Sequence, residues 1–264
     1  MYDFSYKNAS SVDDAINTHK SSEDGAFLAG GQTLLPTLKQ RLAQPSDLID
    51  LSGIGSLSSI EVGQVVKIGA MTTHAEVASS REIQNTLPAL SDLAEGIGDP
   101  QVRNRGTIGG SVANNDPAAD YPAVCLALNA SITTNKREII ADDFFMGMFD
   151  TALEEGELIT SISFPIPEKA AYMKFPNPAS RYALVGVFVA KMNSGVRVAV
   201  TGAGEDGVFR ASNLEDALNQ NFSSESLNDL SISPDGLLSD IHAQNDYRAS
   251  LVVTMAKRAV TAAS

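Results

Sequence analysis

The order of elements in the first 52 residues constrains the fold most strongly. The segment "SVDDAINTHK" at 11–20 has apolar residues at helical spacing after a capping serine, Ser10 or Ser11, and predicts a helix. "GAFLAGG" predicts a short strand that ends in a glycine pair. "TLLPTLKQRLAQP" predicts a second helix, from a Thr33 cap to a stop at Pro45, and "DLIDLS" at 47–52 predicts another strand. This order of helix, strand, turn, helix and strand is typical of a small α/β unit.

The middle of the chain alternates strands and helices. Two strands joined at residues 63–64 precede a helix that begins at Thr72 or Thr73 and continues from residue 81 until the glycines at 96 and 98. Residues 99–116 are rich in turn formers and predict an ordered irregular loop. "DPAADYPAVCLALNASITT" predicts a helix capped by Asp116, with Pro117 at its first position, and then a strand.

Four prolines within residues 161–180 mark a candidate linker between domains. The predicted domains are residues 1–168, with subdomains of about 1–53 and 54–168, and residues 169–264. "YALVGVFVAKM", the turn "NSG" and "VRVAVTGAG" predict an antiparallel hairpin. Helical patterns follow at 212–220, 223–230 and 245–263, the last capped by Asn245 or Asp246, so the second domain is predicted as α+β.

Composition excludes several function classes. The 264 residues carry 32 acidic and 19 basic side chains, a net charge of -13, which argues against a nucleic-acid partner. No apolar stretch approaches the ~20 residues that cross a bilayer, and the start resembles no secretory signal, so a cytoplasmic location is expected. The lone Cys125 and three scattered histidines cannot ligate an iron-sulfur cluster or a structural metal, so redox chemistry would need an organic cofactor or another chain's metals.

Two glycine turns are candidate phosphate sites. In residues 30–34 and in "TIGGS" at 107–111, glycines let the backbone approach a ligand, and free amides at a helix start favour an anion. Two such turns suggest a ligand with two phosphates. Neither matches the dinucleotide or P-loop fingerprint, and "GAGEDG" at 202–207 is predicted to be a plain turn.

The segments "FLAGGQTLLPTLKQRLAQPSDLIDLSGI", "GAMTTHAEVA" and "GIGDPQVRNRGTIGGSVANNDPAADYPAVCLALNA" closely resemble the FAD-binding medium subunits of the molybdenum hydroxylases. That group contains aerobic carbon monoxide dehydrogenase and the flavin segment of xanthine dehydrogenase. The resemblance covers nearly the whole chain, including "YMKFPNPASRYALVGVFVA". It implies an α+β fold, with a two-part FAD-binding domain of the vanillyl-alcohol-oxidase/PCMH type followed by a small α+β domain with an antiparallel sheet and helices.

The resemblance also implies a set of FAD contacts. Asp120 matches a flavin-binding acid, although it could equally complete a helix dipole; Lys174 matches a lysine beside the flavin, and Tyr182 is a weaker candidate because Arg181 precedes it where relatives have aspartate. The implied cofactor contacts are Leu28, Ala29, Gly30, Gly31, Gln32, Thr33, Leu34, Leu35, Ile97, Thr107, Ile108, Gly109, Gly110, Ser111, Asn114, Asp120, Leu158, Lys174 and Tyr182.

Some neighbouring residues have two interpretations. Arg103 and Arg105 could line the cofactor or pair with acids, and a structural role is favoured for at least one. Asn114 could bind FAD, or together with Asn115 only shape the loop, and His74 is interpreted as an ordinary helix-start residue.

The function implied is electron transfer inside a larger hydroxylase. A large molybdenum-pterin subunit would oxidise the substrate, a small iron-sulfur subunit would relay electrons, and FAD here would pass them to an external acceptor, in a dimer of heterotrimers. No catalytic acid, base or nucleophile and no metal ligand are predicted, since the flavin carries the chemistry. The alternatives are a free-standing FAD-dependent oxidoreductase and a non-enzymatic nucleotide-binding module. Related subunits serve carbon monoxide, N-heterocycle and aldehyde enzymes, so the substrate stays open.

Overall fold

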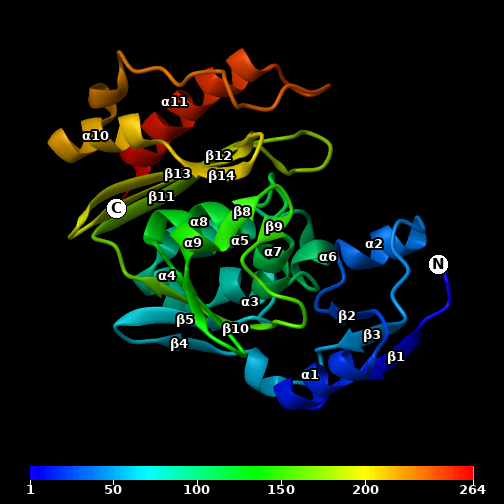
Figure 1. Cartoon of the computed structure of the whole chain (residues 1–264). Helices are drawn as coiled ribbons and strands as arrows, with labels where there is room; N and C mark the ends of the chain where they lie inside the picture. The colour runs from blue at the N-terminus through cyan, green and yellow to red at the C-terminus, as the bar shows by residue number, and fades with distance from the viewer. Residues whose placement is uncertain (264) are drawn as a thin grey trace.

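The computed structural model describes residues 1–263, which form three main sheets with helices between and around them (Figure 1). In the view of Figure 1, an N-terminal unit lies to the right of a central unit, and a C-terminal sheet lies above the central unit. None of the helices in residues 1–263 is both long and apolar enough to cross a bilayer.

The N-terminal unit is the predicted small α/β unit. Its sheet is parallel in the order β1-β3-β2, and β1 was not predicted. The bounds are β1 Ser5–Asn8, α1 Val12–Ser21, β2 Gly25–Leu28, α2 Leu34–Lys39 and β3 Asp47–Asp50. Ser11 caps α1 by accepting a hydrogen bond from Asp14 N. Helix α2 is shorter than predicted, because the chain turns at Arg41 with φ 61° before it reaches Pro45.

The central unit is a five-stranded antiparallel sheet, in the order β4-β5-β10-β6-β7, with helices packed on it. The strands are β4 Ile60–Val62, β5 Val65–Gly69, β6 Ser131–Thr134, β7 Glu138–Ile140 and β10 Ile159–Pro165. The helices are α3 His74–Ser79, α4 Arg81–Thr86, α5 Pro88–Glu95, α6 Pro100–Arg103, α7 Ile108–Asn114, α8 Tyr121–Leu128 and α9 Ala141–Phe144. A small hairpin, β8 Phe145–Gly147 with β9 Asp150–Thr151, follows α9.

Three predictions for this unit were wrong in detail. The helix expected to continue from Thr72 or Thr73 to the glycines is divided at Ser80 and again at Leu87, where Pro88 starts α5. Residues 99–116 are not an irregular loop but contain α6 and α7, capped by Asp99 and Thr107. The cap of α7 and the burial of its apolar side outweigh the low helix propensity of its two glycines. Helix α8 starts at Tyr121, because the Asp116 carboxylate instead accepts a hydrogen bond from Ala118 N in a separate turn.

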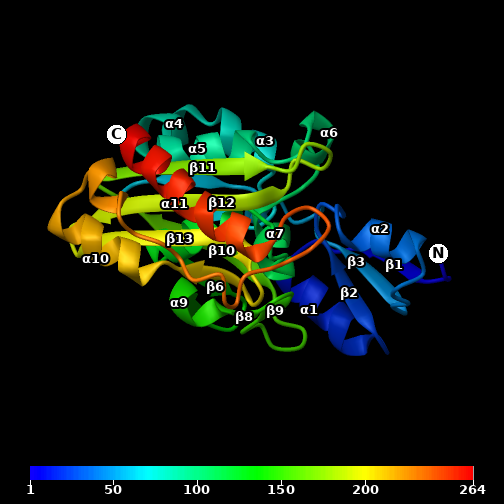
Figure 2. The same ribbon diagram turned by 90° about the horizontal axis from the view of Figure 1, so that it is seen from above.

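The C-terminal sheet has the antiparallel order β11-β12-β13-β14. Its strands are β11 Lys169–Pro176, β12 Ala183–Met192, β13 Gly195–Gly204 and β14 Gly207–Arg210. The helices α10, Ser212–Gln220, and α11, Asn245–Ala262, cover its outer face (Figure 2), while α5 and α8 pack under the inner face. The predicted hairpin is confirmed, and "GAGEDG" is the turn between β13 and β14.

Details at this end differ from the prediction. Residues 224–227 form a 3-10 helix, and the N-cap of α11 is Gln244. The proline-rich segment 161–180 is mostly β10 and β11, and only residues 166–168 connect them. The inner face of the C-terminal sheet contributes Ala170, Phe188 and Ala199 to the same apolar core as α5 and α8. The division into two domains at residue 168 remains a prediction.

Candidate cofactor-binding site

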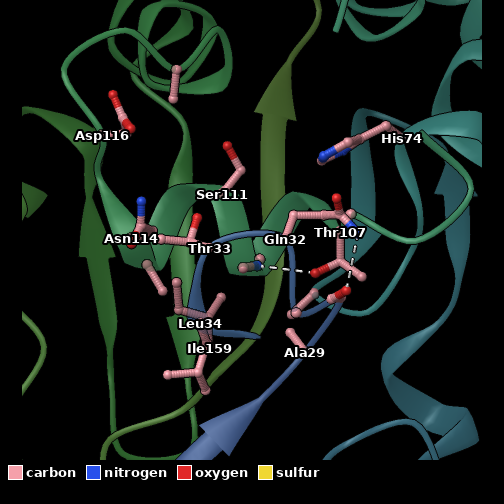
Figure 3. A pocket seen from close by; sticks show the side chains of 18 of the residues that line it. Ala29, Gln32, Thr33, Leu34, His74, Thr107, Ser111, Asn114, Asp116 and Ile159 are labelled. Carbon is pink, nitrogen blue, oxygen red and sulfur yellow. Dashed lines mark hydrogen bonds between the residues drawn. The ribbon is translucent and has the colours of Figure 1, made fainter. Parts of the chain in front are cut away.

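A cavity of about 470 Å³ lies where the N-terminal unit, the central unit and the loop before β12 meet. Its walls come from six separate parts of the sequence, within residues 26–34, 51, 70–74, 97–120, 153–159 and 180–182, which include both glycine turns (Figure 3). Most of the residues expected to contact FAD line it: Ala29, Gly30, Gly31, Gln32, Thr33, Leu34, Ile97, Thr107, Gly109, Gly110, Ser111, Asn114, Asp120, Leu158 and Tyr182.

The other four expected residues support the cavity from behind. Leu28 ends β2, and Leu35 packs under Gly31, where an added Cβ would lie 2.8 Å from Leu35 Cδ1. Ile108 is fully buried in the core beneath α7. Lys174 projects from β11 and pairs with Asp120. We therefore place these four side chains outside the cavity wall.

The first glycine turn leaves backbone donors free. Within residues 1–263 the amides of residues 30 to 34 donate no hydrogen bond, while Gln32 Nε2 lies 3.5 Å from Gly30 O. Gly31 has φ 72°, a conformation that favours glycine. An added Cβ at Gly30 would lie 2.1 Å from Arg105 O, so this glycine lets the two turns approach each other. Free amides converging on one cavity are suited to an anionic group.

The second glycine turn differs from the first, because the amides of residues 108 to 111 already donate hydrogen bonds within the protein. Ile108 N donates to Thr72 O and Gly109 N to Ala70 O, while Gly110 N and Ser111 N donate to Oγ1 and O of Thr107. The side-chain donors of this turn are the hydroxyls of Thr107 and Ser111. The same backbone conformation thus gives α7 its cap and leaves these two side-chain donors on the cavity wall (Figure 3).

A buried ion pair borders the cavity at its C-terminal-sheet side. Asp120 is 4% exposed, and its Oδ1 lies 2.9 Å from Lys174 Nζ and accepts a 2.6 Å hydrogen bond from Tyr172 OH. Lys174 also donates to Gly96 O at 2.7 Å. Burial raises the pKa of Asp120, while Lys174 and Tyr172 act in the opposite direction.

Tyr182 and Arg181 line the same side of the cavity. Arg181 has φ 63° and donates to Gly98 O at 3.3 Å, which ties the loop before β12 to the loop after α5. Burial, together with the charges of Asp116 and Asp120, raises the pKa of Tyr182. This tyrosine therefore stays neutral near pH 7.

The structure separates the alternatives left open for four neighbouring residues. Arg103 has the structural role, donating to Ile97 O, Gly98 O and Glu95, whereas the Arg105 side chain is exposed. Asn114 lines the cavity, and Asn115, with φ 42°, holds the β8–β9 hairpin through Gly147 O and Asp150 O.

Sequence reasoning missed several cavity residues. His74 is the first residue of α3, as expected, but it also lines the cavity; burial and the charge of Arg103 lower its pKa to about 4, so it is neutral at pH 7. Phe27, Leu51 and Met71 add apolar wall. They come from separate strands or their ends, and no local pattern distinguishes them from ordinary core residues.

The donors, glycines and apolar walls fit a long ligand that has a phosphate centre and planar rings. The family model described as "FAD binding domain in molybdopterin dehydrogenase" matches residues 2–167. The chain belongs to this family. Its cofactor is FAD, and it is a flavoprotein subunit of an oxidoreductase.

Full-length relatives agree with this assignment. The chain is 36% identical to the nicotine 6-hydroxylase medium subunit of Paenarthrobacter nicotinovorans, covering 98% of this chain and 96% of that one. It is 35% identical to the carbon monoxide dehydrogenase medium chain of Hydrogenophaga pseudoflava, again over 98% and 96%. A solved carbon monoxide dehydrogenase structure from the same organism superposes with a TM-score of 0.88 over 99% of this chain and 97% of that chain. The mixed α and β fold and the medium-subunit character of this FAD-binding chain are thereby confirmed.

Proposed function

We propose that this chain carries electrons inside a molybdenum-pterin/iron-sulfur hydroxylase complex of the carbon monoxide dehydrogenase type. It would receive them from iron-sulfur clusters on a small subunit, while a large molybdenum-pterin subunit oxidises the substrate, and pass them to an external acceptor. A dimer of heterotrimers in the cytoplasm is the assembly and location we infer. The observation that carries the proposal is the cavity bordered by the free amides of residues 30 to 34.

The residues would divide the work of holding the cofactor. FAD supplies a two-electron carrier, and the chain supplies its position and electrostatics. The amides of residues 30 to 34 and the hydroxyls of Thr107 and Ser111 would bind the pyrophosphate. Ile97 and Leu158 would contact apolar parts of the cofactor. Lys174 would act through Asp120, since its ammonium group is already paired with that carboxylate.

The cysteine content of this chain bears on where the iron-sulfur clusters of the proposed complex would lie. Cys125 is the only cysteine and is fully buried, and burial raises the pKa of its thiol well above the usual range. A cysteine-ligated cluster needs several accessible thiolates. The iron-sulfur clusters of the proposed complex would therefore belong to a partner chain.

Purification tests this proposal against its rivals. We expect the full chain to be yellow, to release FAD on denaturation, and to copurify from its source with a molybdenum-pterin chain and an iron-sulfur chain. A chain that runs alone and turns over a small substrate would instead be a free-standing FAD oxidoreductase. A colourless chain that takes up no added FAD would indicate a nucleotide-binding module without redox function.

A further inference from the structure

Strand β13 has an irregularity beside residues 117–119, a turn that borders the cavity. Its pairing with β14 shifts register between Val200 and Gly204. Gly202, inside this break, has φ 80°, and an added Cβ would lie 2.4 Å from Ala183 O. Interruptions of this kind free backbone groups and redirect side chains, and they are common next to functional sites. In β13, the break frees polar groups that make contacts with the central unit.

Three polar contacts run from the break to the turn at residues 117–119. Thr201 Oγ1 lies 2.6 Å from Ala119 O and 3.1 Å from Pro117 O. Gly202 N donates to Pro117 O at 2.8 Å. Thr201 is fully buried, and its hydroxyl has one proton, so it donates to one carbonyl at a time, and the shorter distance favours Ala119.

The turn that receives these contacts connects two cavity carboxylates. Asp116 precedes it, Asp120 follows it, and both line the cavity. The internal hydrogen bonds of the turn are two, from Ala118 N and Ala119 N to Asp116. Those bonds shape the turn but do not fix it against the rest of the molecule. Lys174 and Tyr172 hold the Asp120 carboxylate at its end, whereas the backbone of the turn itself is held by β13.

The C-terminal helix α11 holds the break in β13 through hydrogen bonds. Arg248 of α11 is 3% exposed and donates through Nη1 to Gly202 O at 2.7 Å and to Leu184 O at 2.6 Å. Its Nη2 donates to Asp240 Oδ2 at 2.8 Å. A continuous series of hydrogen bonds therefore connects α11, through β13, to the turn between the two carboxylates.

We propose that Thr201 is a positioning residue for the cofactor site. It does not line the cavity; it holds the 117–119 turn so that Asp116 and Asp120 face the bound FAD. The C-terminal sheet thereby sets the geometry of the flavin site from outside residues 2–167, the span of the FAD-binding family model. This inference rests on the proposed FAD site.

The experiment compares hydroxyl removal at two buried positions in the full chain. Thr201→Val removes the hydroxyl at nearly constant volume, and Thr201→Ser restores it. Ser91→Ala is the matched control, since Ser91 is 4% exposed and donates to Ala78 O at 2.6 Å away from the cavity. FAD affinity is measured by flavin fluorescence, and the environment of the bound flavin by visible circular dichroism.

We expect Thr201→Val to weaken FAD binding about tenfold, the loss of one buried hydrogen bond, and to alter the flavin circular dichroism. Thr201→Ser should restore both, and Ser91→Ala should change neither. If Thr201→Val does not fold, Thr201→Ala takes its place. Wild-type affinity and spectrum in the folded hydroxyl-free variant, or equal weakening by Ser91→Ala, would overturn the positioning role alone. A wild-type chain that binds no FAD would overturn the proposed function as well.

Discussion

Gly30 determines how closely the two cofactor turns approach. A Cβ at this position would meet backbone atoms, Arg105 O at 2.1 Å and Gly106 Cα at 2.7 Å, so the turns would have to separate. We expect Gly30→Ala to lower the free energy of unfolding by about 2 kcal/mol and to abolish FAD retention. Urea unfolding and the flavin content of the purified protein measure the two effects.

Gly55→Ala is the matched control for Gly30→Ala. An added Cβ at Gly55 meets nothing within 4 Å, and its backbone needs no positive φ. This variant should retain wild-type flavin and stability. Equal flavin content in both alanine variants would contradict the close-approach role of Gly30.

Lys174 neutralises a carboxylate that is almost completely buried. Removing it by Lys174→Met leaves Asp120 without its cation, and we expect a loss of about 3 kcal/mol in the free energy of unfolding near pH 7. Burial raises the pKa of Asp120 above its unfolded-state value of about 4. The free-energy cost of burying the unpaired carboxylate is therefore absent below the unfolded-state pKa and grows as the pH rises through the higher folded-state pKa.

Chemical unfolding of the wild type and Lys174→Met at several pH values tests the direction of this pH dependence. The difference between wild type and Lys174→Met should narrow as the solution is acidified toward pH 4, where Asp120 takes up a proton. The double variant Lys174→Met/Asp120→Asn, which has no buried charge at this site, should lose less stability than the single variant. A pH-independent difference would show that lost packing, and not the unpaired carboxylate, accounts for the effect.

At the scale of elements, α7 connects local stability to cofactor binding. Thr107 caps this helix by accepting a hydrogen bond from Gly110 N at 3.1 Å, and the same hydroxyl is one of the donors left for a phosphate. Thr107→Val should cost about 1 kcal/mol of stability and weaken FAD binding about fivefold. Thermal unfolding and FAD titration measure the two quantities.

The cap of helix α1 provides a control that separates an effect on stability from an effect on FAD binding. Ser11 caps α1 through a 3.0 Å hydrogen bond from Asp14 N and lies outside the cavity. Ser11→Ala should therefore cost similar stability and leave FAD affinity unchanged, and Thr107→Ser should behave as wild type. Weaker FAD binding in Ser11→Ala would show that general destabilisation, not the hydroxyl of Thr107, lowers the affinity.

At the scale of the whole molecule, the C-terminal sheet supports the cavity that we propose as the FAD site. A fragment of residues 1–168 lacks Tyr172 and Lys174 beside Asp120, Thr201 behind the cavity turn, and the apolar side chains that the sheet adds to the core. We expect this fragment to unfold at a lower temperature than the full chain and to retain no FAD. A fragment with the affinity of the full chain would instead support residue 168 as the boundary of an independent domain.

The sequence by itself determined the small N-terminal α/β unit, the β12–β13 hairpin and the glycine turns, because caps, turn formers and periodicity act over a few neighbouring residues. The two turn motifs and their order also indicated the family. Helix α7 was missed for the same reason: its glycines argue against a helix locally, and the burial of Ile108 and Val112 in the core, which favours the helix together with the Thr107 cap, is not visible in a local pattern.

Only the tertiary structure decided which donors are free and which residues meet. The amides of residues 108 to 111 donate to Ala70, Thr72 and Thr107, whereas those of residues 30 to 34 donate to no described residue, a distinction that depends largely on segments far away in sequence. Lys174, expected beside the flavin, is paired with Asp120, and Thr201 reaches Ala119 across 82 positions. Hydrogen bonds between distant segments depend on the packing of the sheets, and a local pattern carries no information about that packing.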